Sequence, residues 1–315
     1  MPLKINTMRV IIMNTLKKTT KAILWLIPSL ILLTACNPSN IKELEERGNQ
    51  ETEDILQSAG LDVASVDDAV IKAEKAIQNG KTDLAQLYYI KAYNMDQNNS
   101  QVLQKMADLY INMKKYDLAE VSFNLILKQQ PDDLKTMEQY GLLLINMRNY
   151  PKAEDYLNRV IAKQQSWRAY NGLGIIANLQ GDALKAETLF KKANGILPNS
   201  PDLLNNIGFA LYSANKLDEA ASYYIKALQI NPGFKKAIYN YGLLQARLSR
   251  YEQAYTAFTK IASPAEANNN IGYIAMMNGD YTEANSYLQE AIQSAPEFYQ
   301  KANDNLMRLD MLQKQ

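Results

Sequence analysis

The side chains that could carry covalent chemistry are few in this sequence. Cys36 is the only cysteine, and the chain contains no histidine. A cysteine thiolate is a nucleophile and a metal ligand, whereas histidine is the commonest general base and a frequent metal ligand. A Cys–His pair, a Ser–His–Asp triad and a histidine-containing zinc site therefore cannot be built. We expect a protein that is not an enzyme and that needs no metal or cofactor.

Asparagine amides recur at regular distances in the second half of the chain. Asn206, Asn240 and Asn270 are 34 and 30 residues apart, and Asn171 precedes them. A carboxamide offers two donor hydrogens and two acceptor lone pairs, which suits the backbone of an extended peptide of any sequence. Tyrosine and arginine are frequent anchors of interfaces, and the same region supplies Arg168, Tyr212, Tyr239, Arg247 and Tyr273. These residues predict a surface that binds a partner protein. The alternative is that the asparagines are solvated or bind neighbouring helical groups.

Charge separates the amino-terminal segment from the rest of the chain. The sequence has 34 basic and 33 acidic residues, and its first 35 residues hold five of the basic residues and none of the acidic ones. The remainder has 29 basic against 33 acidic residues, which argues against a nucleic-acid-binding protein. Lys17, Lys18 and Lys21 precede an apolar run of about 14 residues, whereas a bilayer-spanning helix needs roughly 20. This order is typical of a secretory signal. Met8 and Met13 are alternative start sites to Met1.

The end of that apolar run explains the position of the cysteine. The residues Leu33-Thr34-Ala35-Cys36 resemble the lipobox of bacterial lipoproteins. The resemblance implies that residues 1–35 are a cleaved signal peptide and that Cys36 is acylated, which anchors the chain to a membrane. Asn37 then implies the periplasmic side of the outer membrane, with the inner membrane as the alternative. A small buried thiol in a signal anchor is the other interpretation. The polar residues 36–65 are expected to form a tether.

The elements that position the amides follow from a repeat. An alanine recurs with steps of 34, 34, 33, 34, 34 and 30 residues, at Ala85, Ala119, Ala153, Ala186, Ala220, Ala254 and Ala284. Twelve residues before each alanine stands a small residue, and four residues after it stands a large one. A period of 34 residues is typical of the tetratricopeptide repeat (TPR). In such a repeat the small residue of one helix lets the second helix approach closely.

The fold is therefore predicted to be all-α, a right-handed TPR superhelix (α-solenoid). Seven helix pairs are expected over residues 66–298, with first helices starting near Val66, Ser100, Leu134, Trp167, Pro201, Lys235 and Ala265. Residues 299–315 are expected to form a capping helix. Gly80, Gly181 and Gly279 are expected to adopt left-handed conformations in turns, and Pro264 is expected to end a shortened sixth repeat. By analogy with TPR geometry, the amides listed above would face the concave groove.

The carboxy-terminal half carries a further resemblance. The stretches WRAYNGLGIIANLQGD (167–182), NNIGFALYSANKLDEA (205–220) and PAEANNNIGYIAMMNGDYTEA (264–284), with the ending PEFYQKANDNL (296–306), resemble the TadD-type TPR lipoproteins of tight-adherence (Flp) pilus assembly. The resemblance implies a scaffold that binds pilus or secretin assembly components. A general envelope adaptor that docks peptidoglycan hydrolases or proteases, and a type IV pilus pilotin, are the alternatives.

Overall fold

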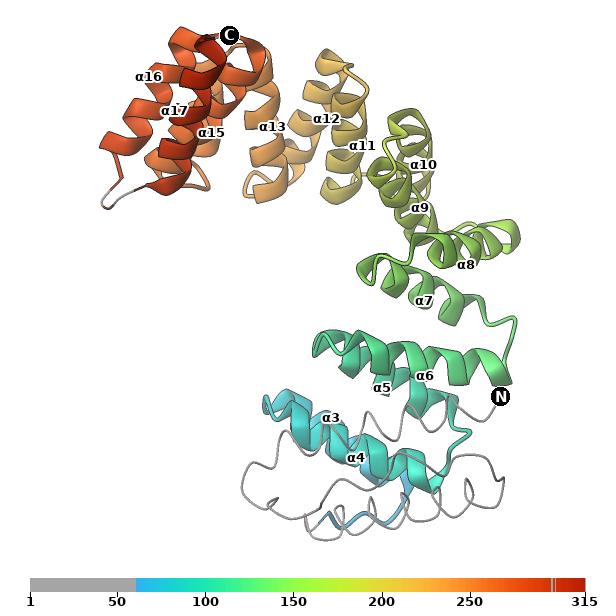
Figure 1. Ribbon diagram of the computed structural model, residues 1–315. Helices are drawn as coiled ribbons and strands as arrows, with labels where there is room; N and C mark the ends of the chain where they lie inside the picture. The colour runs from blue at the N-terminus through green and yellow to red at the C-terminus, as the bar shows by residue number, and fades with distance from the viewer. Residues whose placement is uncertain (1–60, 296, 298, 315) are drawn as a thin grey trace, which may run out of the picture. The chain divides into compact units, whose positions relative to one another are not determined.

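The protein is a stack of α-helices in the part of the chain that the structure describes. The computed structural model describes residues 61–295, 297 and 299–314, and all regular elements in these residues are helical (Figure 1). Cys36, the predicted signal peptide and residues 36–60 of the predicted tether lie outside the described residues. None of the described helices combines the length and the apolar character that crossing a membrane requires. The predicted all-α class is confirmed, with helices in consecutive antiparallel pairs.

The first compact unit extends to Tyr156. Its helices are α3 (Val66–Gln78), α4 (Thr82–Met95), α5 (Ser100–Asn112), α6 (Tyr116–Gln129), α7 (Leu134–Asn146) and the beginning of α8 (Tyr150–Lys163). The pairs α3/α4 and α5/α6 pack internally, and α4 contacts α5 while α6 contacts α7. Residues 61–65, the end of the predicted tether, are held against α3: Leu61 is buried, and Lys72 donates to the carbonyl oxygen of Asp62.

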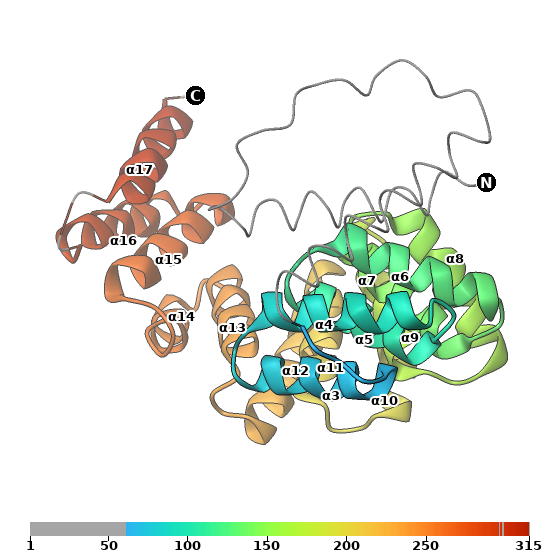
Figure 2. The same cartoon turned by 90° about the horizontal axis from the view of Figure 1, so that it is seen from below.

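The second compact unit begins at Leu157. After the end of α8 it contains α9 (Trp167–Leu179), α10 (Ala183–Ile196), α11 (Pro201–Ser213), α12 (Leu217–Ile230), α13 (Lys235–Arg247), α14 (Tyr251–Phe258), α15 (Pro264–Asn278), α16 (Tyr281–Gln293) and α17 (Gln300–Gln313). The pairs α9/α10, α11/α12, α13/α14 and α15/α16 stack in sequence order, and α17 packs on α15 and α16 (Figures 1 and 2).

The repeat pattern in the sequence corresponds to contacts inside each pair. A methyl group added to Gly208 of α11 would lie 2.7 Å from the ring of Tyr224 in α12. The same approach occurs between Gly174 and Phe190, at 2.6 Å. Because these first helices present no side chain at the contact, the large residue of the second helix rests directly on the backbone, as the sequence predicted.

The ends of the helices follow local rules. Side chains cap the amino termini of six first helices by accepting a backbone N–H bond, namely those of Ser65, Asn99, Asp133, Ser166, Ser200 and Ser263. Gly80, Gly181 and Gly279 have φ values of 71°, 84° and 86°, which confirms the predicted left-handed turns.

The shortened sixth repeat differs in detail from the prediction. Helix α14 has 8 residues and ends at Phe258, well before Pro264, and Pro264 is the first residue of α15. The prediction that this proline ends the sixth repeat is wrong, and the seventh helix pair begins one residue before the predicted start near Ala265. The physical reason is that proline at the first helical position lacks only an N–H that would be unpaired there anyway. A capping box between Ser263 and Glu266 then fixes the start.

Polar links join second helices of neighbouring repeats. Lys216 donates to Glu187 at 3.0 Å, Lys152 to Glu120 at 2.9 Å and Lys115 to Gln86 at 2.9 Å. Each acceptor directly follows the alanine that marks its repeat. Burial opposes ionisation of Glu187, but hydrogen bonds from Lys191 and Lys216 outweigh it and lower the pKa of this carboxyl. The links therefore fix the register between adjacent repeats.

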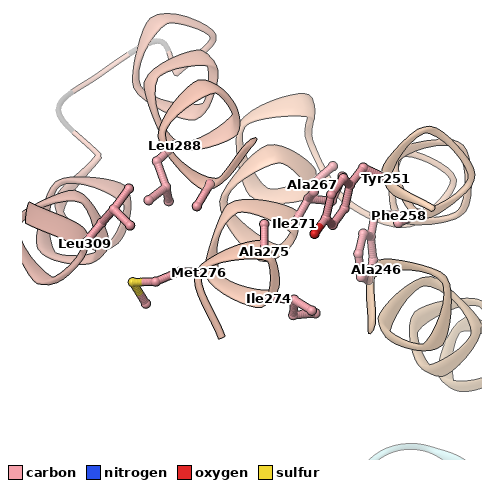
Figure 3. Close-up of a cluster of buried hydrophobic side chains, with 12 residues drawn as sticks. Ala246, Tyr251, Phe258, Ala267, Ile271, Ile274, Ala275, Met276, Leu288 and Leu309 are labelled. Atoms are coloured by element: carbon pink, nitrogen blue, oxygen red, sulfur yellow. The ribbon is translucent and has the colours of Figure 1, made fainter. Parts of the chain in front are cut away.

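The last helix covers the end of the second unit. Leu309 of α17 is fully buried and points toward Leu288 of α16 and Met276 of α15 (Figure 3). Burying a leucine side chain is worth about 1.5–3 kcal/mol. Helix α17 thus closes the apolar cluster that α15 and α16 would otherwise expose, which confirms the predicted capping helix.

Candidate partner-binding groove

The first helices of the second unit form a row. Helix α11 contacts α13, α13 contacts α15, and α15 contacts α17, although α11, α13 and α15 each also pack on a partner within a pair. The asparagines predicted to bind a partner come from this row. Because the first helices of the second unit recur at nearly constant spacing and each rests on its partner through a glycine, equivalent positions lie side by side along the row.

Four asparagine amides are connected across three of these helices. Asn240 of α13 donates its side-chain N–H to Oδ1 of Asn205 at 2.9 Å, and Asn205 donates to Oδ1 of Asn206 at 3.4 Å. Asn206 in turn donates to Oδ1 of Asn171 in α9 at 2.9 Å. The chain of bonds therefore runs from α13 through α11 to α9, and we call it the amide chain.

The amide chain fixes the orientation of groups that a partner could use. Asn205 is 4% exposed and is held by bonds on both sides, whereas Asn171, Asn206 and Asn240 are partly exposed. Each carboxamide has two donor hydrogens and two lone pairs, so one bond of each kind leaves capacity for a ligand. Groups that are already oriented lose less entropy when they bind. The arrangement thus offers oriented donors and acceptors to an extended backbone.

Beside the amide chain lies a shallow hollow of about 510 Å³, which we call the amide groove. It is lined by residues of α11 and α13 and by one residue after α14, namely Asn205, Asn206, Phe209, Lys235, Lys236, Tyr239, Asn240 and Ile261. Phe209 is 38% exposed and Tyr239 is 41% exposed. Large exposed apolar side chains beside polar groups are typical of interaction surfaces.

Three other predicted interface residues, Tyr212, Arg168 and Tyr273, lie outside the lining of the amide groove. The ring of Tyr212 stacks on that of Phe209, with centroids 6.5 Å apart, and so supports the groove from α11. The guanidinium of Arg168 lies over the ring of Trp167 at 4.7 Å, at the start of α9. Tyr273 of α15 is 38% exposed. None of these three lines the groove itself.

Asn270 and Arg247 stand apart from the amide chain. No hydrogen bond within the described ranges joins Asn270 to Asn240; its neighbour Asn269 instead accepts from Asn305 of α17 at 3.0 Å. Arg247 is exposed at the end of α13, and its carbonyl oxygen accepts from Asn278 at 3.4 Å. The structure therefore brings together Asn171, Asn206, Asn240 and Tyr239 from the predicted set.

Five residues that line the amide groove are absent from the predicted interface set. They are Asn205, Phe209, Lys235, Lys236 and Ile261. Phe209 directly follows the small residue Gly208, a position that faces the same side as the amides, so the repeat pattern could have identified it. Ile261 carries no such signal, because its place depends on where α14 ends.

Two other features were candidates for a functional site: a second hollow, and acidic residues that could bind a metal ion. A hollow of about 450 Å³ is lined by residues of α12, α13 and α14 with Pro232 and Lys260, and none of the predicted residues lines it. Across the described part of the chain, no cluster of three or more Cys, Asp or Glu side chains could hold a metal ion. The amide groove is therefore the candidate functional site.

Solved structures share this fold. A tetratricopeptide repeat protein from Parabacteroides merdae matches 78% of this chain and 98% of its own, with a TM-score of 0.59 and 15% identity. PilW, described as a widely conserved type IV pilus biogenesis factor, matches 78% of this chain and 97% of its own, with a TM-score of 0.51 and 18% identity. At such identities the similarity is one of fold.

Curated relatives match over a short part of their length. The peroxisomal targeting signal receptor of Candida albicans is 35% identical over 83 residues, which cover 26% of this chain and 14% of the receptor. The receptor of Saccharomyces cerevisiae is 29% identical over 98 residues, which cover 31% of this chain and 16% of the receptor. The chain thus spans about one seventh of each receptor's length.

Sequence profiles described as tetratricopeptide repeat match residues 76–139, 141–201, 201–234 and 265–298. The matches fall in both compact units and include α9 and α11 of the amide chain, whereas α13, which carries Asn240, lies between two of them. Together with the contacts between small and large residues inside each pair, they show that the chain is a tetratricopeptide repeat protein.

Proposed function

We propose that the chain is a non-enzymatic scaffold that binds an extended segment of a partner protein in the amide groove. TPR proteins are protein–protein interaction scaffolds, and the specific location is our proposal. The observation that carries it is the amide chain next to the exposed rings of Phe209 and Tyr239. The amides suit a peptide backbone, and the rings offer apolar contact area to its side chains.

We further propose that the scaffold is a lipoprotein of the outer membrane that faces the periplasm. The support is the sequence Leu33-Thr34-Ala35-Cys36 after a basic and apolar leader, with Asn37 following. Each buried CH₂ of a lipid chain contributes about 0.8 kcal/mol, so more than one chain gives stable anchoring. Replacement of Cys36 by alanine should abolish palmitate labelling and release the chain from membranes. Unchanged labelling of the Cys36→Ala variant would refute lipidation at this site.

The pathway we propose is assembly of a tight-adherence (Flp) type pilus and its secretin. The support is the resemblance of residues 167–306 to TadD-type lipoproteins, and a type IV pilus biogenesis factor shares the fold. The peroxisomal receptors in the comparison bear names that refer to a targeting signal, which accords with segment recognition by repeats of this kind.

Site-specific photocrosslinking in native envelopes tests the proposed groove and the pathway together. A photoreactive residue would replace Phe209, which lines the amide groove, and a matched control would replace Ile225 of α12, which is 41% exposed. We expect adducts from position 209 and far fewer from position 225. Equal or greater yield from position 225 would place the interface on the second helices and refute the proposed groove.

The identity of the adducts tests the pathway. Secretin or pilus components among the adducts from position 209 would support pilus assembly. Peptidoglycan hydrolases or proteases among them would instead identify a general envelope adaptor, the alternative left open by the sequence. A variant with both Asn206→Ala and Asn240→Ala should lose these adducts while its helicity, measured by circular dichroism, is retained. Asn285→Ala, on the second helix α16, is its control.

A further inference from the structure

The amide groove carries an unbalanced positive charge. The inference drawn from this charge rests on the proposed function and adds the kind of segment that the groove binds. Lys235 and Lys236 open α13, line the groove and are both exposed. Across the described residues, neither forms a salt bridge, and no acidic side chain lines the groove. Other lysines of the chain are used differently: Lys216 and Lys152 pair with carboxylates of neighbouring repeats. The two groove lysines are thus cations without an internal counter-charge.

The apolar part of the same groove depends on the shortened sixth repeat. The second helices α10 and α12 each have 14 residues, whereas α14 has 8. The chain leaves α14 at Phe258 and turns back through residues 259–263 to α15, which carries Ile261 into the groove. Ile261 faces the groove together with Phe209 and Tyr239. The short repeat therefore supplies one wall of a site for an apolar side chain.

The bound segment should run past the groove rather than end in it. The amide chain continues from Asn240 and Asn206 in the groove to Asn171 of α9, which does not line it. Backbone contacts can therefore extend beyond the two lysines along the row of first helices. The groove is also shallow and open, so that it does not enclose a chain end.

We propose that the partner segment recognised here is an internal, extended stretch in which a large apolar side chain stands within two residues of an aspartate or glutamate. The apolar side chain contacts Phe209, Tyr239 and Ile261, and the carboxylate is bound by Lys235 and Lys236. Hydrogen bonds between charged groups are stronger than neutral ones, and opposite charges give specificity and faster association.

Peptide selection with the full-length chain in detergent tests this specificity. The probe is a library of random dodecapeptides displayed inside a phage coat protein, so that both ends of each peptide are joined to flanking sequence. We expect enrichment of peptides with an aliphatic or aromatic residue within two positions of Asp or Glu. For the enriched peptides, the double variant Lys235→Glu, Lys236→Glu should weaken binding at least about tenfold, the equivalent of about 1.4 kcal/mol.

Two controls separate this inference from the proposed function. Lys226→Glu reverses one charge on the exposed surface of α12, half of the change made by the double variant, and should leave binding within about twofold of the wild type, since Lys226 lies on a second helix away from the groove. Ile261→Ser should weaken binding and leave the preference for acidic residues intact.

The possible results lead to different conclusions. Enrichment of neutral or basic peptides that still depend on Asn206 and Asn240 would overturn the acidic preference and leave the proposed groove standing. Equal loss with Lys226→Glu would show a general charge effect and overturn the inference. A selection with no enrichment, or one insensitive to the asparagines, would overturn the proposed groove and this inference with it.

Discussion

Substitution of Gly208 by alanine tests the packing on which the repeat depends. The added methyl group would lie 2.7, 2.8 and 3.1 Å from three ring atoms of Tyr224, a side chain that is fully buried. Overpacking of a core commonly costs about 1–3 kcal/mol, whereas alanine in place of glycine inside a helix contributes up to about 1 kcal/mol. We expect a net loss of unfolding free energy of up to about 2 kcal/mol.

The same substitution at Gly195 of α10 is a matched control. Apart from its chain neighbours and the backbone of its own helix, no atom lies within 4 Å of the position where its methyl group would be. Only the helix propensity and the smaller entropy of the unfolded chain then change, so Gly195→Ala should stabilise the protein by up to about 1 kcal/mol. The two variants therefore change stability in opposite directions although the chemical change is identical.

Urea denaturation followed by circular dichroism at 222 nm measures the difference, and hydrogen exchange of α11 and α12 locates it. Alanine already occupies the equivalent position in the first two repeats, at Ala73 and Ala107, where both residues are fully buried. Helix pairs can therefore adapt to a methyl group, and the variant should fold. Equal stabilisation by Gly208→Ala and Gly195→Ala would refute the view that Tyr224 requires the bare glycine backbone.

Two further predictions concern the polar link and the turns. Glu187→Gln should lower the free energy of unfolding at neutral pH, because it removes the charge that binds Lys191 and Lys216. The loss should be only about 1 kcal/mol, since both lysines are partly exposed. Since the pKa of Glu187 is lowered by folding, this contribution is present above the pKa of the unfolded chain and is lost as the pH falls through the folded value. The difference between wild type and variant should therefore shrink in denaturation measurements as the pH falls below about 4.3, the ordinary pKa of a glutamate, and a difference that stays constant there would contradict the ionic link. Lys114→Gly, at φ 57°, should stabilise the protein by about 1 kcal/mol, and Gly181→Ala, at φ 84°, should destabilise it by a similar amount. Melting temperatures of the two variants that shift in the same direction would refute this reasoning.

Much of the fold could be predicted because the repeat places the same packing demand at the same position each time. The small residue, the alanine and the large residue recur because two helices must approach closely in every pair. The first six predicted starts, from Val66 to Lys235, coincide with helix starts. The seventh differed by one residue, because Pro264 can serve equally as a helix breaker and as the first residue of a helix.

The polar links and the groove wall could not be predicted from a single repeat. The bond from Lys216 to Glu187 joins residues 29 positions apart, and its existence depends on the distance between neighbouring second helices. Ile261 enters the groove only because α14 ends early. Such features arise from how one repeat meets the next, whereas periodicity describes what the repeats have in common.

The bonds of the amide chain also depend on how neighbouring repeats meet, and their spacing explains why the chain stops at Asn240 of α13. The sequence suggested a ladder of one asparagine per repeat at a single position, but both bonds between repeats join residues 35 apart, Asn206 to Asn171 and Asn240 to Asn205. The separation of 35 residues is one more than the 34-residue period. Each bond therefore joins an asparagine to the residue that lies just before the equivalent position of the preceding repeat. With the 30-residue step of the sixth repeat, the corresponding partner of Asn270 is residue 239, a tyrosine. A phenol ring has no carboxamide to continue the chain, so the amides stop at α13. The same residue, Tyr239, lines the groove with its exposed aromatic ring. The apolar part of the groove therefore lies where the amide chain ends.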